Sequence, residues 1–253
     1  MIYGHSMQLT RISRLVGLCT LLVACASSGP SGHIVTPDTG ETLTSIPGPM
    51  PDFGPFDSVA DAILAACPVI VRQPHALIPV PRTAQDFGVY WRAASEYCAW
   101  LYSVDGEHVE MSLLATSRIQ DDPSKRRCDL PARVADSRHP EATVAYLVML
   151  HNHPSGASIS VPDLYAIAGM ASTHGAVQKF RGQQVSISIV AFVGKENRDG
   201  TPGCAGFYHY VPARSDEIVR YTIDDERLMK QVVARVAWSV EGAPKVLPVG
   251  EQP

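Results

Sequence analysis

Six residues constrain the fold of this chain more than any others, the stretch His-Asn-His-Pro-Ser-Gly at residues 151–156. It follows the apolar, partly β-branched run at residues 144–150, which predicts a short buried strand. Residues i and i+2 of a strand project to the same face. We therefore expect His151 and His153 to converge while Asn152 points to the other side.

A helix should begin soon after this strand. Pro162 suits a first helical turn because its missing N–H costs nothing there, and residues 163–174 continue with helical character. Asp163 would then lie at the opening of the helix, after Ser160. Two neutral imidazoles and one carboxylate make a three-ligand zinc site that leaves a fourth position for water. The sequence therefore predicts that His151, His153 and Asp163 hold Zn²⁺.

The first 24 residues predict a signal peptide and are excluded from fold reasoning. Arg11 and Arg14 precede an apolar segment at residues 15–24, which is too short to span a bilayer comfortably. The segment ends in Leu-Val-Ala-Cys25, which resembles the bacterial lipoprotein signal. That resemblance implies cleavage before Cys25, lipidation of this cysteine (palmitate among the lipids) and anchoring in the bacterial cell envelope, in the outer membrane if the source is Gram-negative. An ordinary secretory signal and an uncleaved anchor are the alternatives.

Charge and cysteine content narrow the class of protein further. Removing residues 1–24 leaves 19 basic and 25 acidic residues, a net charge of −6 that argues against binding of nucleic acid. Outside the cytoplasm, the four cysteines beyond Cys25 would meet conditions in which disulfides persist. Three pairings of four cysteines exist, and the sequence does not choose among them. Cys67 and Cys98 are alternatively small buried apolar residues.

The remaining chain divides into a tether, a domain and a tail. Residues 25–56 are rich in Ser, Gly, Thr and Pro and predict a flexible tether behind the lipid, and residues 241–253 predict a disordered tail. The domain at residues 57–240 should be α/β (α+β), a mixed β-sheet flanked by helices. We expect a helix at residues 58–66 capped by Asp57, strands at 97–102 and 109–114 joined by a turn at Asp105-Gly106, a polar loop at 120–138, strands at 185–193 and 207–211, and a closing helix at 224–240.

The histidine segment resembles that of the JAMM/MPN (JAB-like) metalloprotease superfamily, and the wording His-Asn-His-Pro-Ser-Gly resembles its RadC-like bacterial members. The family pattern is a Glu on an early strand, then His-x-His-Pro, then Ser-x-x-Asp, here Ser160 to Asp163. One departure is that nine residues separate His153 from Asp163, where the family usually has ten. The resemblance implies a JAB/MPN (cytidine deaminase-like) sandwich and a zinc-dependent peptidase or isopeptidase that acts on a peptide or protein substrate.

The catalytic Glu must be chosen from Glu96, Glu107 and Glu110. Glu96 opens a segment, residues 96–102, that resembles the Glu-x-Gly-Gly-Leu-x-Tyr strand of an uncharacterised bacterial branch, the DUF4329-like proteins. We therefore assign Glu96 as the general base that takes a proton from the attacking water. Ser160 would donate a hydrogen bond to the tetrahedral oxyanion, cap the helix, or do both.

Two other functions compete with the peptidase. A catalytically silent MPN-like module, binding a partner or associated with a toxin, is favoured by the shortened spacing between His153 and Asp163. A zinc nucleobase deaminase is disfavoured because His-x-Glu and Pro-Cys-x-x-Cys are both missing.

Overall fold

The computed structural model describes residues 32–38, 41–79, 83–116, 127–140, 143–224 and 227–249. The predicted signal peptide and Cys25 lie outside these residues, as do residues 120–126 of the predicted polar loop. Within the described ranges, no helix combines the length and the apolar character needed to cross a membrane.

A ten-stranded mixed sheet forms the centre of the described part of the chain. Its strands run in the order β1 (Ile34–Val35), β5 (Leu114–Thr116), β3 (Tyr97–Ser103), β7 (Ala145–Asn152), β10 (Ser188–Glu196), β11 (Pro202–Tyr210), β12 (Glu217–Asp224), β13 (Arg227–Trp238) and β14 (Pro244–Pro248), with β4 (Glu110–Met111) beside β3. Two small sheets accompany it, β2 (Ser45–Gly48) with β6 (Arg133–Asp136), and β8 (Val177–Phe180) with β9 (Gln183–Ser186). The expected mixed α/β architecture is confirmed.

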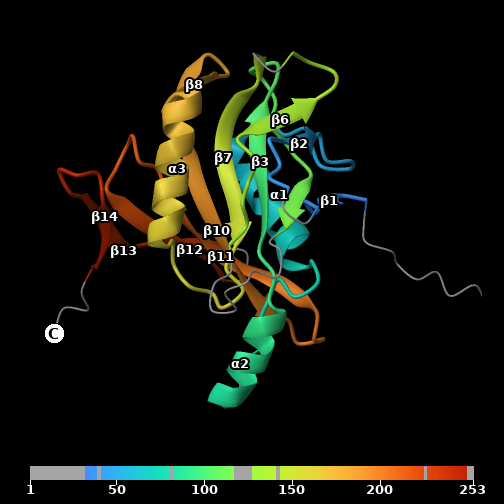
Figure 1. Cartoon of the computed structure of the whole chain (residues 1–253), viewed down its shortest axis with the longest axis vertical. Coiled ribbons are helices and arrows are strands. Elements are labelled where there is room, and N and C mark those ends of the chain that lie inside the picture. The colour runs from blue at the N-terminus through green and yellow to red at the C-terminus, as the bar shows by residue number, and fades with distance from the viewer. Residues whose placement is uncertain are drawn as a thin grey trace, which may run out of the picture. The chain divides into compact units, whose positions relative to one another are not determined.

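Helices cover the two faces of the sheet. Helix α3 (Val161–His174) lies in the connection between the parallel strands β7 and β10, on the near side of the sheet in Figure 1, while α1 (Val59–Val71) lies behind. A parallel pair needs such a crossover connection. Side chains of β3 alternate between the layers: Ala99 and Leu101 pack with α1, and Cys98 and Trp100 pack in the cluster that contains α3.

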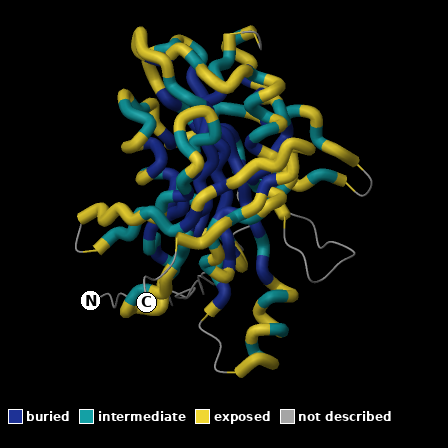
Figure 2. The backbone as a smooth tube through the Cα atoms, turned by 90° about the vertical axis from the view of Figure 1, so that its left-hand side faces the viewer, coloured by how far each residue is buried: buried dark blue, intermediate teal, exposed yellow. Residues whose placement is uncertain are grey.

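The central strands are buried on both faces, which explains why they read as continuous apolar runs. All seven residues of β3 are buried, and so are seven of the eight residues of β7. Figure 2 shows these strands as a dark blue core beneath exposed loops. This rigid centre supports the histidines at the end of β7.

Helix α1 differs from the prediction at both ends. Its N-cap is Ser58, whose hydroxyl oxygen accepts a hydrogen bond from the backbone N–H of Asp61, so Asp57 is not the cap. The helix also passes through Pro68 to Val71. Burial of the helix face around Ala66 and Ile70 against the sheet outweighs the hydrogen bond that proline removes.

The predicted helix at residues 224–240 is wrong, because this segment forms β13 between β12 and β14. The prediction rested on apolar residues spaced by four, Leu228, Val232 and Val236. A spacing of four is an even number and so also places residues on one face of a strand. The β-branched valines favour the strand.

The predicted tether and tail also contain structure. Ile46 in β2 is fully buried and Phe53 is nearly so, and β1 and β2 pair with β5 and β6. At the other end, β14 pairs with β13. The packed unit therefore begins at Gly32 rather than at residue 57 and continues beyond residue 240. Hydrogen bonds to strands far away in the sequence order the N-terminal segment, and a hairpin with β13 orders residues 244–248.

The other predicted strands are found with shifted bounds. The strand at 97–102 is confirmed as β3, whereas 109–114 divides into β4 and the start of β5, 185–193 spans the end of β9 and most of β10, and 207–211 belongs to β11. The predicted loop at 120–138 contains β6.

One further helix, α2 (Ala84–Ala93), has no counterpart in the sequence prediction. Thr83 and Asp86 form its capping box, no residue of the helix is buried, and α2 projects away from the sheet in Figure 1.

Two disulfides cross-link the domain. Cys67 of α1 pairs with Cys204 of β11, and Cys98 of β3 pairs with Cys128. This selects one of the three pairings that the sequence left open. It also excludes the alternative in which Cys67 and Cys98 are unpaired apolar residues.

Candidate metal centre

Three predicted ligands meet at the end of β7. Nε2 of His151 lies 3.0 Å from Nε2 of His153, and these two atoms lie 3.4 Å and 3.3 Å from the two carboxylate oxygens of Asp163. Among the described residues, this is the one group of three or more His, Cys, Asp or Glu side chains whose donor atoms come close enough to share a metal ion.

These distances suit a small tetrahedral cation. Ligand atoms about 2.0–2.1 Å from a tetrahedral zinc ion lie about 3.3 Å from one another. The distance between the two Nε2 atoms, and the distance from each to the nearer Asp163 oxygen, differ from that edge by only a few tenths of an ångström. The two rings contact different oxygens of the carboxylate, and one donor atom from each residue lies within 4.8 Å of the others. Two imidazoles and a carboxylate also belong to the ligand types that zinc accepts. The group of His151, His153 and Asp163 could therefore hold a metal ion.

The extended backbone at the end of β7 places both imidazoles on the same face of the sheet. His151 is paired with Cys98 of β3 and with Ala191 of β10, and the N–H of His153 continues this pairing by donating to the carbonyl of Phe192. Both histidines are buried, at 6% and 8% relative exposure. The expected convergence of His151 and His153 is confirmed.

Asn152, between the two histidines, points away from them and ties three segments together. Its side-chain oxygen accepts from the N–H of Tyr97, and its amide group donates to the carbonyls of Ala76 and Ser95. The middle residue of the motif therefore fixes the end of β7 against β3 and against the loop after α1.

A second contact orients the ring of His153. Its Nδ1 lies 2.9 Å from the carbonyl oxygen of Ala157. Because a carbonyl only accepts, Nδ1 must carry the proton, which leaves the Nε2 lone pair of the neutral ring for a metal ion. The ring therefore presents the atom that faces Asp163.

The loop from His153 to α3 is long enough to bring Asp163 to the rings. The nine residues between His153 and Asp163 include Gly156, which has φ of +73° and donates its N–H to the carbonyl of His153. The tight turn returns the chain to Ser160, the N-cap of α3, and Asp163 follows at the third helical position. The shortened spacing therefore leaves Asp163 within reach of both imidazoles.

The electrostatics of the cluster favour positive charge at its centre. Burial by itself raises the pKa of Asp163, but the charge of His151 and hydrogen bonds with both imidazoles outweigh burial and hold that pKa far below its usual range. Burial lowers the pKa of His153, but its contacts with Asp163, together with the charge of Glu96, raise this pKa above its usual value. Such a site attracts a cation.

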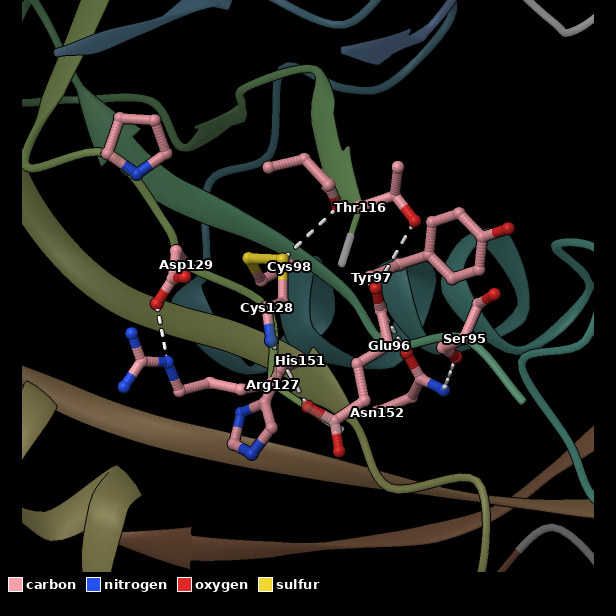
Figure 3. Close-up of a disulfide and its surroundings, with 12 residues drawn as sticks. Ser95, Glu96, Tyr97, Cys98, Thr116, Arg127, Cys128, Asp129, His151 and Asn152 are labelled. Carbon is pink, nitrogen blue, oxygen red and sulfur yellow. Dashed lines mark hydrogen bonds and ion pairs between the residues drawn. A yellow bond between two sulfur atoms is a disulfide. The ribbon is translucent and has the colours of Figure 1, made fainter. Parts of the chain in front are cut away.

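Glu96 lies beside this cluster. Because Cys98 is opposite His151 in the antiparallel pair, Glu96 lies at the level of His153, one residue before β3. Its side chain is buried, and its Oε2 accepts a hydrogen bond from the backbone N–H of Cys128 at 3.2 Å. Figure 3 shows Glu96 between the disulfide and Asn152.

The alternative glutamates lie elsewhere. Glu107 is exposed in the hairpin turn after β3. Glu110 is opposite Tyr102, at the far end of β3 from Cys98, and its two carboxylate oxygens accept from Arg138 at 3.1 and 2.6 Å. Of the three candidates, only Glu96 is placed at the histidine end of the sheet.

Ser160 is the N-cap of α3, so the capping role expected for it is confirmed. Its hydroxyl donates to Asp163 Oδ2 at 2.7 Å, and its oxygen accepts from the N–H of Asp163 at 3.4 Å. A hydroxyl has one proton. In this arrangement that proton is directed at Asp163 rather than toward an incoming oxyanion.

Sequence reasoning missed the groups that support the ligands. The carbonyl of Ala157 and the backbone N–H of Cys128 carry no side-chain signal, and only the pairing of Cys98 with Cys128 would have drawn attention to the latter. His108 and His174, two of the remaining histidines, instead bind Asp105 and the carbonyl of Ala132. They take no part in the cluster.

Comparisons with known proteins add no assignment to this geometry. The sequence matches no protein-family model, and neither the curated proteins nor the solved structures contain a match to the chain.

Proposed function

We propose that this chain is a zinc-dependent peptidase or isopeptidase of the JAMM/MPN type, held outside the cytoplasm by a lipidated Cys25. The observation that carries the proposal is the meeting of His151, His153 and Asp163 with donor atoms close enough to share a metal ion, with the buried carboxylate of Glu96 beside them. A JAB/MPN sandwich is the fold that we propose for the sheet between α1 and α3.

Each residue has a defined task in this proposal. A zinc ion would lower the pKa of a water molecule toward neutrality and polarise the carbonyl of the scissile amide. Glu96 accepts the proton of the attacking water at its carboxylate and later delivers it to the leaving amine. Asp163 and the two imidazoles bind the ion, while Ser160 keeps the Asp163 carboxylate in place.

The cell envelope is the proposed location, and the two disulfides support it. Disulfides persist in oxidising compartments and are rare in the cytosol. The substrate that we propose in that location is a peptide or protein. Nucleic acid is disfavoured, because the mature chain is acidic and offers no general attraction for it. Palmitate labelling of the full chain should be lost in a Cys25→Ala variant, and labelling that persists would remove the anchor from the proposal.

Metal analysis by plasma mass spectrometry tests the ligand set. The full chain should carry close to one zinc ion, which His151→Ala and Asp163→Ala should lose. His75→Asn is the matched control, because His75 is exposed and Asn tolerates its φ of +60°. A wild-type chain without any transition metal after loading would end the peptidase proposal.

Turnover of a peptide library separates the enzyme from a silent binding module. Glu96→Gln should retain zinc and lose activity by at least about 100-fold, within the range that general acid–base groups contribute. Glu107→Gln, with its exposed carboxylate, should remain active. A zinc-loaded wild type that hydrolyses no amide in the library would favour the binding module.

A further inference from the structure

We propose that the Cys98–Cys128 disulfide is a positioning element of the active site, which holds the backbone N–H of Cys128 against the carboxylate of Glu96 and so fixes the orientation of the general base. This inference rests on the proposed function for the role of Glu96, and on contacts of the structure for everything else.

The contact itself is direct. The N–H of Cys128 donates to Oε2 of Glu96 at 3.2 Å, across 32 positions of sequence. Glu96 is only 6% exposed, so this amide contacts its carboxylate inside the protein. Figure 3 shows the carboxylate of Glu96 turned toward Cys128, on the side of β3 where His151 lies.

The segment that carries this amide has no regular secondary structure of its own. Residues 127–132 form neither helix nor strand, so no ladder of backbone hydrogen bonds places the Cys128 N–H. Contacts that hold the segment to β3 include the disulfide to Cys98 and the indole N–H of Trp100, which donates to the carbonyl of Pro131 at 2.8 Å. Of these, the disulfide acts at the residue whose amide contacts Glu96.

The other end of the disulfide is fixed to the metal-binding strand. Cys98 is 3% exposed and is paired with His151, and its Cα lies 5.8 Å from the Cα of Cys128. Cys98, Glu96 and His151 therefore share one face of the β3–β7 pair. A covalent bond from this face sets the distance between the Cys128 amide and the cluster.

Orientation of this carboxylate decides whether it can work as a base. A general base must lie within hydrogen-bond reach of the proton it abstracts, about 2.6–3.2 Å. The amide donates to Oε2 and so helps to set the direction in which the carboxylate points. Without the amide, one contact that orients the carboxylate is lost, and the productive orientation would be populated for less of the time.

The second disulfide offers a matched control. Cys67–Cys204 joins α1 to β11 in the apolar layer on the α1 side of the sheet, whereas Cys98 and Cys128 lie in the layer on the α3 side. Removing it deletes the same kind of cross-link and leaves the Glu96 contact untouched. Any effect specific to the Cys98–Cys128 bond must then come from its place in the structure.

The experiment compares Cys98→Ala/Cys128→Ala with Cys67→Ala/Cys204→Ala in the full, oxidised chain. Four quantities are measured: zinc content, the hydrogen-exchange rate of the residue 128 amide by NMR, and kcat and KM on the best substrate of the peptide library. The Cys98/Cys128 variant should keep its zinc, exchange this amide at least tenfold faster, and lose at least tenfold in kcat with KM within twofold of wild type. The Cys67/Cys204 variant should match the wild type in zinc content, kcat and KM, and its residue 128 amide should exchange more slowly than that of the Cys98/Cys128 variant, although its overall stability is lower.

A second measurement leaves both disulfides intact. Glu96→Ala should also accelerate exchange of the Cys128 amide at least tenfold, whether or not the chain is an enzyme. The inference is overturned if exchange in the Cys98/Cys128 variant stays within twofold of wild type, if its kcat does so, or if the control variant loses kcat equally. If the wild type hydrolyses nothing, the proposed function fails, and the exchange rates alone then decide whether the disulfide places the amide.

Discussion

Ser160 and Asp163 hold each other at the start of α3. The hydroxyl and the backbone N–H of Ser160 both donate to Oδ2 of Asp163, each at 2.7 Å. The same oxygen lies 3.3 Å from Nε2 of His153. One carboxylate therefore takes part in both the helix cap and the candidate metal cluster. A substitution that removes the cap should also weaken metal binding.

Ser160→Ala tests this coupling. Loss of the cap should lower the free energy of unfolding by about 1 kcal/mol, and loss of the hydroxyl that orients the ligand should weaken zinc binding by about 10- to 100-fold. Urea denaturation and competition with a zinc chelator measure the two effects. Ser58→Ala is the control, because the Ser58 hydroxyl is the N-cap of α1 and accepts from the backbone N–H of Asp61, which is not part of the metal cluster. Equal zinc affinity in the two variants would contradict the coupling.

Gly156 and Gly182 form a second matched pair. Both adopt left-handed backbone conformations, with φ of +73° and +72°. Alanine at either position should cost about 1–2 kcal/mol of stability. A Cβ at Gly156 would lie 3.4 Å from Val193 in the loop that leads to Asp163, whereas at Gly182 it would meet nothing within 4 Å.

We therefore expect both Gly→Ala variants to unfold at lower urea concentration, and only Gly156→Ala to bind zinc more weakly. Calorimetric titration of the metal-free proteins with zinc gives the comparison. Unchanged affinity in Gly156→Ala would mean that the loop does not set the position of the aspartate.

His209 should make stability fall as the solution becomes acidic. Burial, and to a lesser degree the charge of Lys230, lower the pKa of His209 from 6.5 to about 4. Its Nε2 is buried without a hydrogen-bond partner among the described residues. The unfolded chain therefore binds the proton first, so the stabilisation is complete above pH 6.5 and is lost as the pH falls toward 4.

The size of this effect is at most about 3 kcal/mol, from the difference between the two pKa values. In His209→Leu the decline between pH 7 and pH 4.5 should be correspondingly shallower, as measured by urea denaturation of the metal-free chain. Parallel pH profiles for wild type and variant would show that His209 is not the titrating group.

The disulfide whose removal costs more stability should not be the one whose removal costs more activity. Cys67–Cys204 closes a sequence separation of 137 residues and Cys98–Cys128 one of 30. The loop-entropy model assigns about 5 kcal/mol to the longer loop and about 4 kcal/mol to the shorter one. Denaturant titration should therefore find the Cys67/Cys204 variant the less stable, although it is the one expected to keep its activity.

The site was more predictable from the sequence than the domain limits were. His151, His153, Ser160 and Asp163 lie within thirteen positions, where strand periodicity and helix capping act over a few residues. Local rules of this kind need no knowledge of the distant chain. The Cys128 amide that contacts Glu96 depends on a disulfide partner 30 residues away, and no local pattern reveals it.

Strands at the two ends of the domain could not be predicted for a related reason. Residues 45–48 read as Ser-Ile-Pro-Gly, which favours a turn, yet they pair with Arg133–Asp136 as β2. Residues 244–248 begin and end in proline and gain their order only beside β13. The partner strand supplies the free energy in both cases, and strand preference depends strongly on such context.

The ligands and the proposed base reach the cluster by different routes through the chain. His151, His153 and Asp163 belong to one uninterrupted strand-loop-helix unit, whose eight-residue connection costs little entropy to close. Glu96 immediately precedes the neighbouring strand β3. The backbone amide that contacts its carboxylate, that of Cys128, belongs to a third segment of the chain. In the enzyme that we propose, affinity for a cation should therefore be inherited as a single short module, whereas hydrolysis would require three separate stretches to be conserved together. Descendants of such a gene should lose hydrolysis before they lose metal binding.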